Sequence, residues 1–195
     1  MSGAGGGRFL QWVKLNGNWK VVLGLEVSHF LAQRARAKGL DIVMGDIQSA
    51  GFRDSVFDVV TMWDVIEHLA WPLDGLKQIN RILSPRGILI LSTPNRESVL
   101  HSLSIWMHRL GIGLLQKPAR RVFVGHPLYF SMSSLRQLLA RSGFILRISW
   151  QYSVASEMSF RGGLMEDAAK IMDIFLGKAL KRRYRMVIVA QKDGG

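Results

Sequence analysis

The chain has 195 residues, 48% of them hydrophobic, which suits one globular domain (1–195) with a sizeable core. It has no cysteine, which excludes disulfides and thiolate metal sites, and charges interrupt every apolar run before the roughly 20 residues of a membrane-spanning helix. The net charge of +12 is uneven, with ten Lys and Arg against eight Asp and Glu in residues 1–95, and 16 against six in residues 96–195.

A glycine cluster opens the chain, at Gly3, Ala4, Gly5 and Gly7. Alternate glycines let a backbone approach a ligand closely, and a following helix, which residues 9–13 could open, aims free N–H groups at it. The third glycine of a dinucleotide fingerprint is absent, because Arg8 or Leu10 stands in its place, and this disfavours nicotinamide and flavin cofactors. By itself the cluster is weak evidence, since flexible chain ends have the same composition.

After the glycines, apolar segments of strand length alternate with helix-like segments at the spacing of βαβ units. The expected strands are Trp19–Glu26, Leu40–Gly45, Val56–Trp63 and Gly87–Ser92. The expected helices are Phe30–Lys38, which Gly39 ends, and Pro72–Leu83. Near-continuous apolar strands joined by helices predict an α/β fold with a doubly wound, mostly parallel sheet and helices on both faces.

Acidic residues stand where the first two of these strands end, and ligands bind at the carboxyl ends of strands in such sheets. Glu26 lies 19 residues after Gly7, close to the usual distance for a carboxylate that accepts both hydroxyls of a ribose. Asp46 could accept a hydrogen bond from an amino group such as that of adenine, or could equally cap the turn after Gly45. The glycine loop and Glu26 together indicate an adenosine cofactor.

The order of these motifs resembles that of the class I S-adenosylmethionine-dependent methyltransferases, of the small-molecule type. That family has a G-x-G-x-G loop, an acidic residue after strand 2, a G-D step after strand 3, and F-D-V-V leading to D-V-x-E-H-L after strand 4. The matching residues here are GAGGG from Gly3, Glu26, Gly45 with Asp46, and FDVVTMWDVIEHL over Phe57–Leu69. The segments that resemble strand 5, the helix before strand 6 and the antiparallel edge strand are Arg81–Asn95, His126–Phe144 and Tyr184–Ala190.

The resemblance implies a Rossmann-like domain that binds S-adenosylmethionine and releases S-adenosylhomocysteine. The residues that it places at the cofactor are Gly3, Ala4, Gly5, Gly7, Glu26, Val27, Asp46, Ile47, Trp63 and Asp64. The glycines would line the methionine end, Glu26 would bind the ribose hydroxyls and Val27 would pack against the adenine. Asp46 with Ile47 would frame the adenine amino edge, and the last two residues would close the site at strand 4.

The family's strand 1 has no counterpart in the sequence, because its acidic end would fall at Met1. That strand is central in the family's sheet, so its absence would expose apolar faces of the neighbouring strands and leave their backbone groups unpaired. We therefore expect a strand, and with it a helix, upstream of Met1 in the natural protein.

Catalysis of methyl transfer depends mainly on positioning and on exclusion of water. A base is needed only for hydroxyl or carbon acceptors, and because imidazole titrates near working pH, His68 and His126 are the catalytic candidates. Each has a structural alternative. His68 could start a helix and pair with Asp64 or Glu67, and His126 could be a loop residue fixed before Pro127.

Two other chemistries are disfavoured. His101 and His108 are seven residues apart, too far for the usual i, i+4 pair, so no metal is predicted. The N-P-P-Y type of motif, which many methyltransferases acting on bases carry after strand 4, is replaced by WDVI at residues 63–66. The chain also lacks a recognised RNA module, so nucleic acid is not an expected partner.

The acceptor is expected to meet two insertions outside the shared core, at about 97–125 and 151–180, which are rich in apolar residues and flanked by Lys and Arg. We expect them to pack on the core or form a lid. Alternatively, amphipathic helices with basic ends could lie at a membrane surface and present a lipid-like acceptor. The basic excess fits such peripheral membrane contact or an anionic partner, although a solvated face explains it equally well.

The sequence therefore predicts methyl transfer from S-adenosylmethionine to a small or lipid-like acceptor, at oxygen. No stretch near the start has the order of a signal peptide, so a cytoplasmic or membrane-peripheral location is expected. One alternative is a non-catalytic fragment or pseudoenzyme with an interaction role. A third reading, an RNA methyltransferase, draws only on the basic second half.

Overall fold

A computed structural model describes residues 4–99, 101, 102, 105, 109, 127–153 and 175–194. In chain order its elements are α1 (Arg8–Asn16), β1 (Leu23–Glu26), α2 (His29–Arg36), β2 (Asp41–Met44), β3 (Phe57–Trp63), the 3-10 helix η1 (Ile66–His68), α3 (Pro72–Ile82), β4 (Leu83–Pro94), α6 (Met132–Arg141), β5 (Phe144–Tyr152) and β6 (Arg185–Lys192). The alternation of strands and helices expected from the sequence is present. β1 is shorter than expected because the preceding Trp19 and Val21 are exposed outside the strand.

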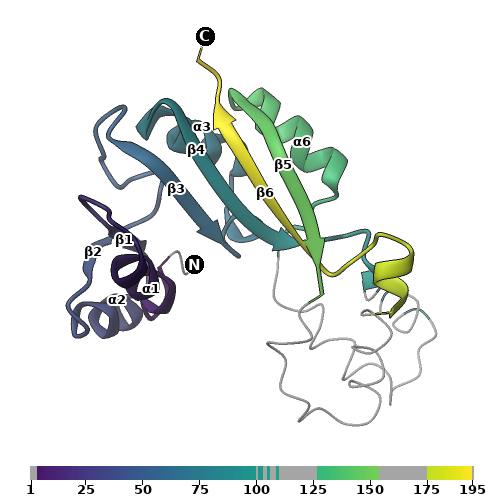
Figure 1. Cartoon of the computed structure of the whole chain (residues 1–195), viewed down its shortest axis with the longest axis horizontal. Helices are drawn as coiled ribbons and strands as arrows, with labels where there is room; N and C mark the ends of the chain where they lie inside the picture. The colour runs from purple at the N-terminus through teal and green to yellow at the C-terminus, as the bar shows by residue number, and fades with distance from the viewer. Residues whose placement is uncertain are drawn as a thin grey trace.

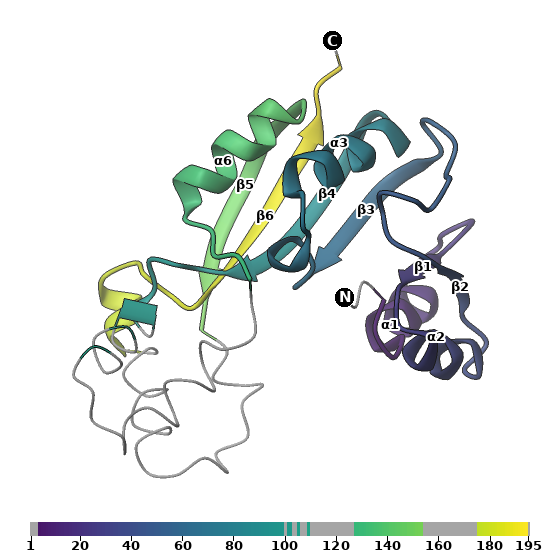
Figure 2. The same cartoon turned by 180° about the vertical axis from the view of Figure 1, so that it is seen from behind.

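The strands form two sheets (Figure 1). β1 and β2 make a parallel pair, and the other strands make a sheet in the order β3-β4-β6-β5. In that sheet β3 and β4 are parallel, and β6 runs antiparallel to both of its neighbours. This is the predicted Rossmann-like α/β architecture with two corrections. Among the described residues α3 and α6 cover one face of the four-stranded sheet, whereas helices were expected on both faces (Figure 2). The antiparallel strand lies inside the sheet rather than at its edge, because β5 pairs along the side of β6 that faces away from β4.

Within the described residues the two sheets are not hydrogen-bonded to each other, and β1 and β3 each have one unpaired side. The resemblance expects a further central strand between them. The carbonyl of Glu26 points toward β2 and accepts a hydrogen bond from the N–H of Gly45. The carbonyl of Leu25 points to the opposite side of β1 and accepts one from the N–H of Ala4. The glycine loop thus runs beside the open side of β1. A strand upstream of Met1 stays a prediction.

The main core lies between the four-stranded sheet and the helices α3 and α6, which cover the same face of it (Figure 2). Leu76 and Ile79 of α3 recur at helical spacing, and Leu135 and Leu139 of α6 do the same, so each helix turns one apolar stripe to the sheet. Ser131 begins α6 as a capping residue whose hydroxyl accepts the N–H of Ser134 at 3.1 Å. A second, small cluster joins α2 to β2 and consists of Ala32, Ala35, Leu40 and Ile42.

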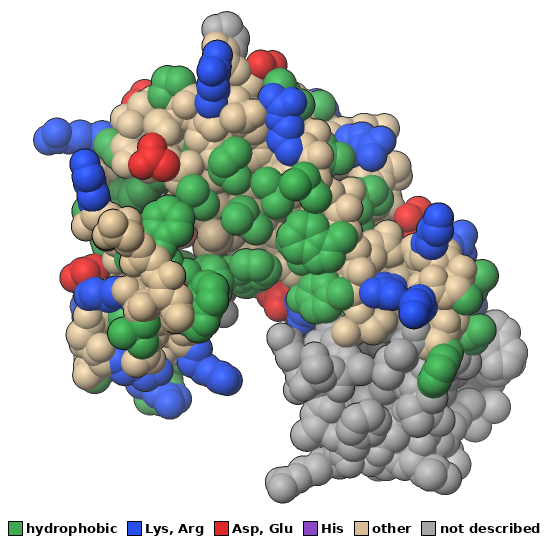
Figure 3. Space-filling view, viewed as in Figure 1, with side chains coloured by type: hydrophobic (Ala, Val, Ile, Leu, Met, Phe, Trp, Pro, Cys, Tyr) green, Lys and Arg blue, Asp and Glu red, His purple; other side chains and the backbone are tan. Residues whose placement is uncertain are grey.

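The other face of the four-stranded sheet carries apolar side chains that remain partly exposed (Figure 3). Its central cross-strand row consists of Thr61, Ile90, Val189 and Ile148. Ile148 is 59% exposed and Trp150 47%, whereas Leu89 and Leu91, which point to α3 and α6, are fully buried. The strands of one sheet therefore have one face in the core and one in contact with solvent in the described structure.

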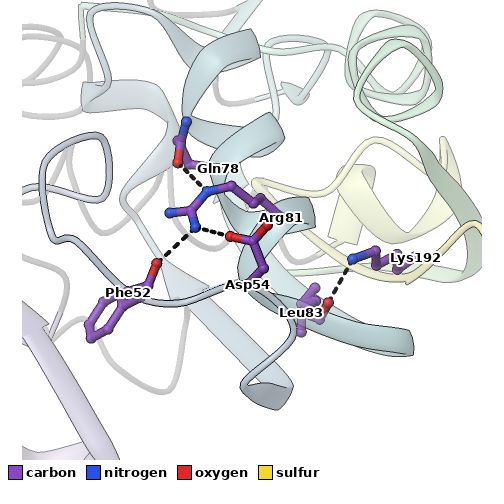
Figure 4. Close-up of polar contacts among 6 residues, drawn as sticks. All are labelled: Phe52, Asp54, Gln78, Arg81, Leu83 and Lys192. Carbon is purple, nitrogen blue, oxygen red and sulfur yellow. Dashed lines mark hydrogen bonds and ion pairs between the residues drawn. The ribbon is translucent and has the colours of Figure 1, made fainter.

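Arg81 near the end of α3 ties the segment before β3 to the helix (Figure 4). Its guanidinium donates to Gln78 Oε1 at 2.9 Å and to the carbonyl of Phe52 at 2.8 Å, and it pairs with Asp54. This contact fixes the connection into β3. Because β3 and β4 are parallel, their carboxyl ends reach the same edge of the sheet.

Most residues of the two expected insertions, 97–125 and 151–180, lie outside the described ranges. In the part of the chain that is described, no helix is both long and apolar enough to cross a membrane.

Candidate active site

The glycine loop bends through Gly5 and Gly7, which have φ values of 55° and 80°. A Cβ at Gly7 would lie 2.4 Å from Leu40 Cδ1 and 3.0 Å from Ala35 Cβ, so both the backbone conformation and the close approach of α2 require glycine there. A Cβ at Gly5 would meet nothing within 4 Å, so the space beside this part of the loop is open. Gly3 lies outside the described residues.

Glu26 ends β1, and its carboxylate holds the glycine loop against the strand. The residue is 1% exposed. Its Oε2 accepts the N–H of Gly5 at 2.7 Å, and its Oε1 accepts the N–H of Ser28 at 2.9 Å, just before α2 begins. Each carboxylate oxygen can accept a further hydrogen bond, so Glu26 keeps capacity for a hydroxyl donor beside the open loop. The next residue, Val27, is partly buried.

Asp46 follows β2 and shapes the turn there. Its Oδ1 accepts the N–H of Gln48 at 2.9 Å, which is the turn-capping role that the sequence left open beside a contact with a nucleobase. The N–H of Gly45 donates to the carbonyl of Glu26 at 3.1 Å, so the ends of β1 and β2 lie together. Ile47 packs against the main core.

At the end of β3, Trp63 and Asp64 connect to distant elements. The ring of Trp63 meets that of Phe9 from α1 edge-on, with centroids 5.2 Å apart, which places the helix after the glycine loop against this strand. Asp64 has a left-handed backbone (φ 54°), and its N–H donates to the carbonyl of Ser92 at 3.0 Å. Its carboxylate forms an ion pair with Arg185 at the start of β6, and this pair spans the end of β4.

Glu67 in η1 is an acidic residue that the sequence analysis did not place in the site. It is fully buried, and Thr93 Oγ1 at the end of β4 donates to its Oε2 at 3.0 Å. Burial raises the pKa of the Glu67 carboxyl to about 7, and the negative charge of Asp64 acts in the same direction. Its backbone carbonyl accepts the N–H of Leu128 at 3.2 Å. Glu67 therefore joins η1 to β4 and to the segment before α6.

Of the two histidine candidates, only His68 lies among the described residues. It ends η1 beside Glu67, is partly exposed, and its backbone N–H donates to the carbonyl of Val65 at 2.9 Å. It lies at the carboxyl edge of the sheet, and its catalytic role stays a prediction. His126 lies outside the described residues.

Tyr129 and His101 add an aromatic pair that sequence reasoning missed. Their ring centroids are 4.8 Å apart. Burial raises the pKa of the Tyr129 hydroxyl, with the Glu67 charge acting in the same direction. Burial also lowers the pKa of His101, as does the positive charge of Arg96. The sequence offered no periodic signal for these contacts, because they join loop segments far apart in the chain.

Metal chemistry finds no support in the described ranges, where no group of three or more His, Asp or Glu lies close enough together to hold an ion. The predicted absence of a metal stays a prediction.

A sequence profile described as a methyltransferase domain matches residues 2–147, three quarters of the chain. The chain belongs to this methyltransferase family. Curated relatives include the ubiquinone biosynthesis O-methyltransferase of Ruegeria pomeroyi, 32% identical over 108 residues, which are 51% of this chain and 42% of that protein. The demethylmenaquinone methyltransferase of Chlamydia muridarum is 29% identical over 101 residues, 49% of this chain and 42% of that protein. The chain thus spans about two fifths of the length of these relatives.

The fold of the methyltransferase domain also matches solved structures. A SAM-dependent methyltransferase from Thermotoga maritima superposes with a TM-score of 0.66 at 24% identity, over 98% of this chain and 80% of that one. This likeness supports the Rossmann-like fold.

Several of the predicted site residues that the structure describes thus lie close together at the carboxyl ends of its strands. The glycine loop and Glu26 are in direct contact, Asp46 lies beside them, and Trp63 reaches them through Phe9. Asp64 is turned toward Arg185, a partner that the sequence did not indicate.

Proposed function

We propose that this methyltransferase domain transfers a methyl group from S-adenosylmethionine to a small or lipid-like acceptor, at an oxygen atom. The observation that carries the proposal is the contact of the buried Glu26 carboxylate with the N–H of Gly5 at the open side of the glycine loop. It joins, in one place, an acceptor for ribose hydroxyls and a backbone that a ligand can approach closely.

The residues present fit the cofactor. Glu26 would accept the ribose hydroxyls, and Val27 and Ile47 would contact the adenine. The loop at Gly5 and Gly7 would hold the methionine end. When bound, S-adenosylmethionine supplies an electrophilic methyl carbon, and the domain's own work is to orient both reactants and to keep water away.

The acceptor class rests on the relatives. The Ruegeria protein is named for ubiquinone biosynthesis and for O-methylation, and the Chlamydia protein for demethylmenaquinone. Both names point to ring compounds of the quinone type, so a hydroxyl on a ring that carries an apolar tail fits the small or lipid-like acceptor of the proposal.

On the acceptor side, Glu67 acts as a positioning residue. Its bonds to Thr93 and to the N–H of Leu128 fix the ends of β4 and of the segment before α6. A hydroxyl acceptor must also lose a proton, and His68, which is partly exposed at the same edge, is the base that we propose for it.

Thermal melts with and without S-adenosylhomocysteine test cofactor binding, because a ligand that binds only the folded state raises the midpoint. At a hundredfold excess over the dissociation constant the gain is about 2.7 kcal/mol, or roughly 5–10 °C for a domain of this size. Glu26→Gln should weaken binding at least about tenfold, because the amide nitrogen can accept neither a ribose hydroxyl nor the backbone N–H that the carboxylate oxygen in its place accepts. Asp41→Asn, at an exposed carboxylate on β2, should leave it unchanged. A cooperative melt that the ligand does not move would instead favour a non-catalytic role.

A further inference from the structure

A cleft of about 380 Å³ opens where β5 ends, outside the residues placed at the cofactor. Its lining consists of Met132, Ser149, Trp150, Gln151, Lys178, Lys181 and Arg183. These residues come from three places: the start of α6, the last residues of β5, and the segment from the helical residues 175–179 to the start of β6. The size lies within the usual range for small-molecule sites.

The lining combines positive charge with apolar surface. Among the described residues, Lys178, Lys181 and Arg183 are its charged groups, and no described Asp or Glu lines it. None of these cations belongs to an ion pair with any carboxylate that the described ranges include. Trp150 is 47% exposed and offers an aromatic wall. Figure 3 shows Lys and Arg side chains gathered beside apolar ones in this part of the molecule. Such a cleft fits a ligand with an anionic group joined to an apolar body.

Hydrogen bonds with Gln151 and Asn95 fix the backbone of Arg183. Gln151 Oε1 accepts the N–H of Arg183 at 3.0 Å. Asn95, which is 1% exposed at the end of β4, donates its Nδ2 to the carbonyl of Arg183 at 3.0 Å and to Gln151 Oε1 at 3.4 Å. The segment entering β6 is thus fastened to the ends of β4 and β5, so the cleft is preorganised to bind.

The cleft shares an edge of the sheet with the candidate active site. β5 is parallel to β3 and β4, because β4 and β5 are both antiparallel to β6, so the three carboxyl ends point the same way. The order β3-β4-β6-β5 separates Asp64, after β3, from the end of β5 by three strand spacings. At about 4.8 Å each, this is roughly 14 Å. A ligand that reaches from one to the other must be elongated.

We propose that the acceptor is an elongated amphiphile with an anionic group, a phosphate or carboxylate, which this cleft holds roughly 14 Å from Asp64 in the candidate active site. That the ligand of this cleft is the methyl acceptor rests on the proposed function. Binding in the cleft can be measured without methyl transfer or cofactor.

The test uses dodecyl phosphate, below its micelle concentration, as the anionic probe, and dodecyl maltoside as an uncharged probe with the same tail. Calorimetric titration of the full chain gives the affinity for each. Lys178→Gln and Arg183→Gln remove one charge each from the cleft, and Lys77→Gln, at an exposed lysine on α3, is the matched control. Melting curves establish that each variant folds like the natural chain.

We expect dodecyl phosphate to bind at least about tenfold more tightly than dodecyl maltoside, and each cleft variant to lose roughly five- to tenfold of that affinity. Added salt should weaken binding, because the cleft cations are partly exposed. Lys77→Gln should bind like the natural chain.

Equal affinity for the two probes, or equal loss in Lys77→Gln and the cleft variants, would overturn the proposal. A second arm uses vesicles of phosphatidylcholine with 30% phosphatidylglycerol. Vesicle binding that depends on Lys178 and Arg183, without binding of monomeric dodecyl phosphate, would make the cleft a membrane contact and refute the acceptor site. Because S-adenosylhomocysteine is absent from these titrations, a failure here leaves the cofactor melt as an independent result.

Discussion

Replacing Glu67 by Gln should stabilise the folded domain at alkaline pH and leave it nearly unchanged near pH 4.5. Burial raises the pKa of this carboxyl from 4.5 to about 7. In the folded state the neutral acid is therefore favoured, and Glu67 contributes stability below its unfolded pKa. That contribution is lost as the pH rises through about 7, because the folded protein must then hold a buried carboxylate.

The size of the effect follows from the shift. A raise of about 2.5 units at 1.36 kcal/mol per unit gives an upper bound of about 3 kcal/mol between pH 4.5 and pH 8. Glutamine is neutral at both pH values, has nearly the same shape, and its amide oxygen can still accept the hydrogen bond from Thr93. The charges around the site belong to Asp64, Arg185 and the ionisable Tyr129, and they are the same in both proteins.

The assay is urea unfolding of the natural chain and of Glu67→Gln at both pH values, with the difference in unfolding free energy compared between them. Titrations common to the two proteins, such as those of the histidines, cancel in this difference. Glu97→Gln changes an exposed carboxylate and should show no pH-dependent difference. If Glu67→Gln were less stable than the natural chain at pH 8, the folded protein would favour the charged form of Glu67. Our conclusion that burial disfavours this carboxylate would then be refuted.

Two further substitutions test the packing of the site. Gly7→Ala should cost roughly 1–3 kcal/mol of stability, because the new Cβ meets Leu40 and φ is 80°, whereas Gly6→Ala, with nothing within 4 Å, should stay within about 0.5 kcal/mol in the same urea assay. Arg185→Met should cost roughly 1–3 kcal/mol of unfolding free energy, because it removes the partner of Asp64. In a double-mutant cycle, the variant that also carries Asp64→Asn should recover part of that loss. Additive effects in the cycle would mean that the two side chains do not interact in solution.

The elements that the sequence predicted well are those with strong local signals. β3 was expected from Val56 and begins at Phe57, and the expected helix Pro72–Leu83 ends one residue earlier, as α3. The contact between Glu26 and the glycine loop follows from motif order and spacing, since a helix and a strand of typical length lead from the loop to Glu26.

What the sequence could not supply depends on contacts between distant segments. Asp64 and Arg185 are 121 residues apart, and nothing in the pattern around either one indicates the other. The burial of Glu67 arises because η1 lies between the end of β4 and the segment at Leu128, two elements that approach it only in the folded chain. The place of β6 inside the sheet likewise depends on how β5 pairs, which periodicity alone does not determine.

Because the strands form two separate sheets in the described residues, β3 is an edge strand of the four-stranded sheet. Its sequence is as apolar as that of β4, yet most of its side chains stay partly exposed, because β4 has strand neighbours on both sides and β3 on one. The N–H of Asp64 donates to Ser92 of β4, and backbone groups alternate along a strand. The N–H groups of Val60 and Met62 therefore also face β4, whereas those of Val59, Thr61 and Trp63 face the open side.

Amide hydrogen exchange should show this alternation. In a sample of residues 1–195 without any upstream segment, we expect Val59, Thr61 and Trp63 to exchange at least about a hundredfold faster than Val60 and Met62, because amides on an unpaired edge need no opening of the sheet to meet solvent. Residue-resolved exchange followed by NMR measures both sets in one sample, and the β4-facing amides serve as the internal control. Equal protection of the two sets would mean that a further strand pairs along β3 in solution. In that case the four-stranded sheet would have a neighbour beyond the described residues, and the partial exposure of β3 would not hold for the protein in solution.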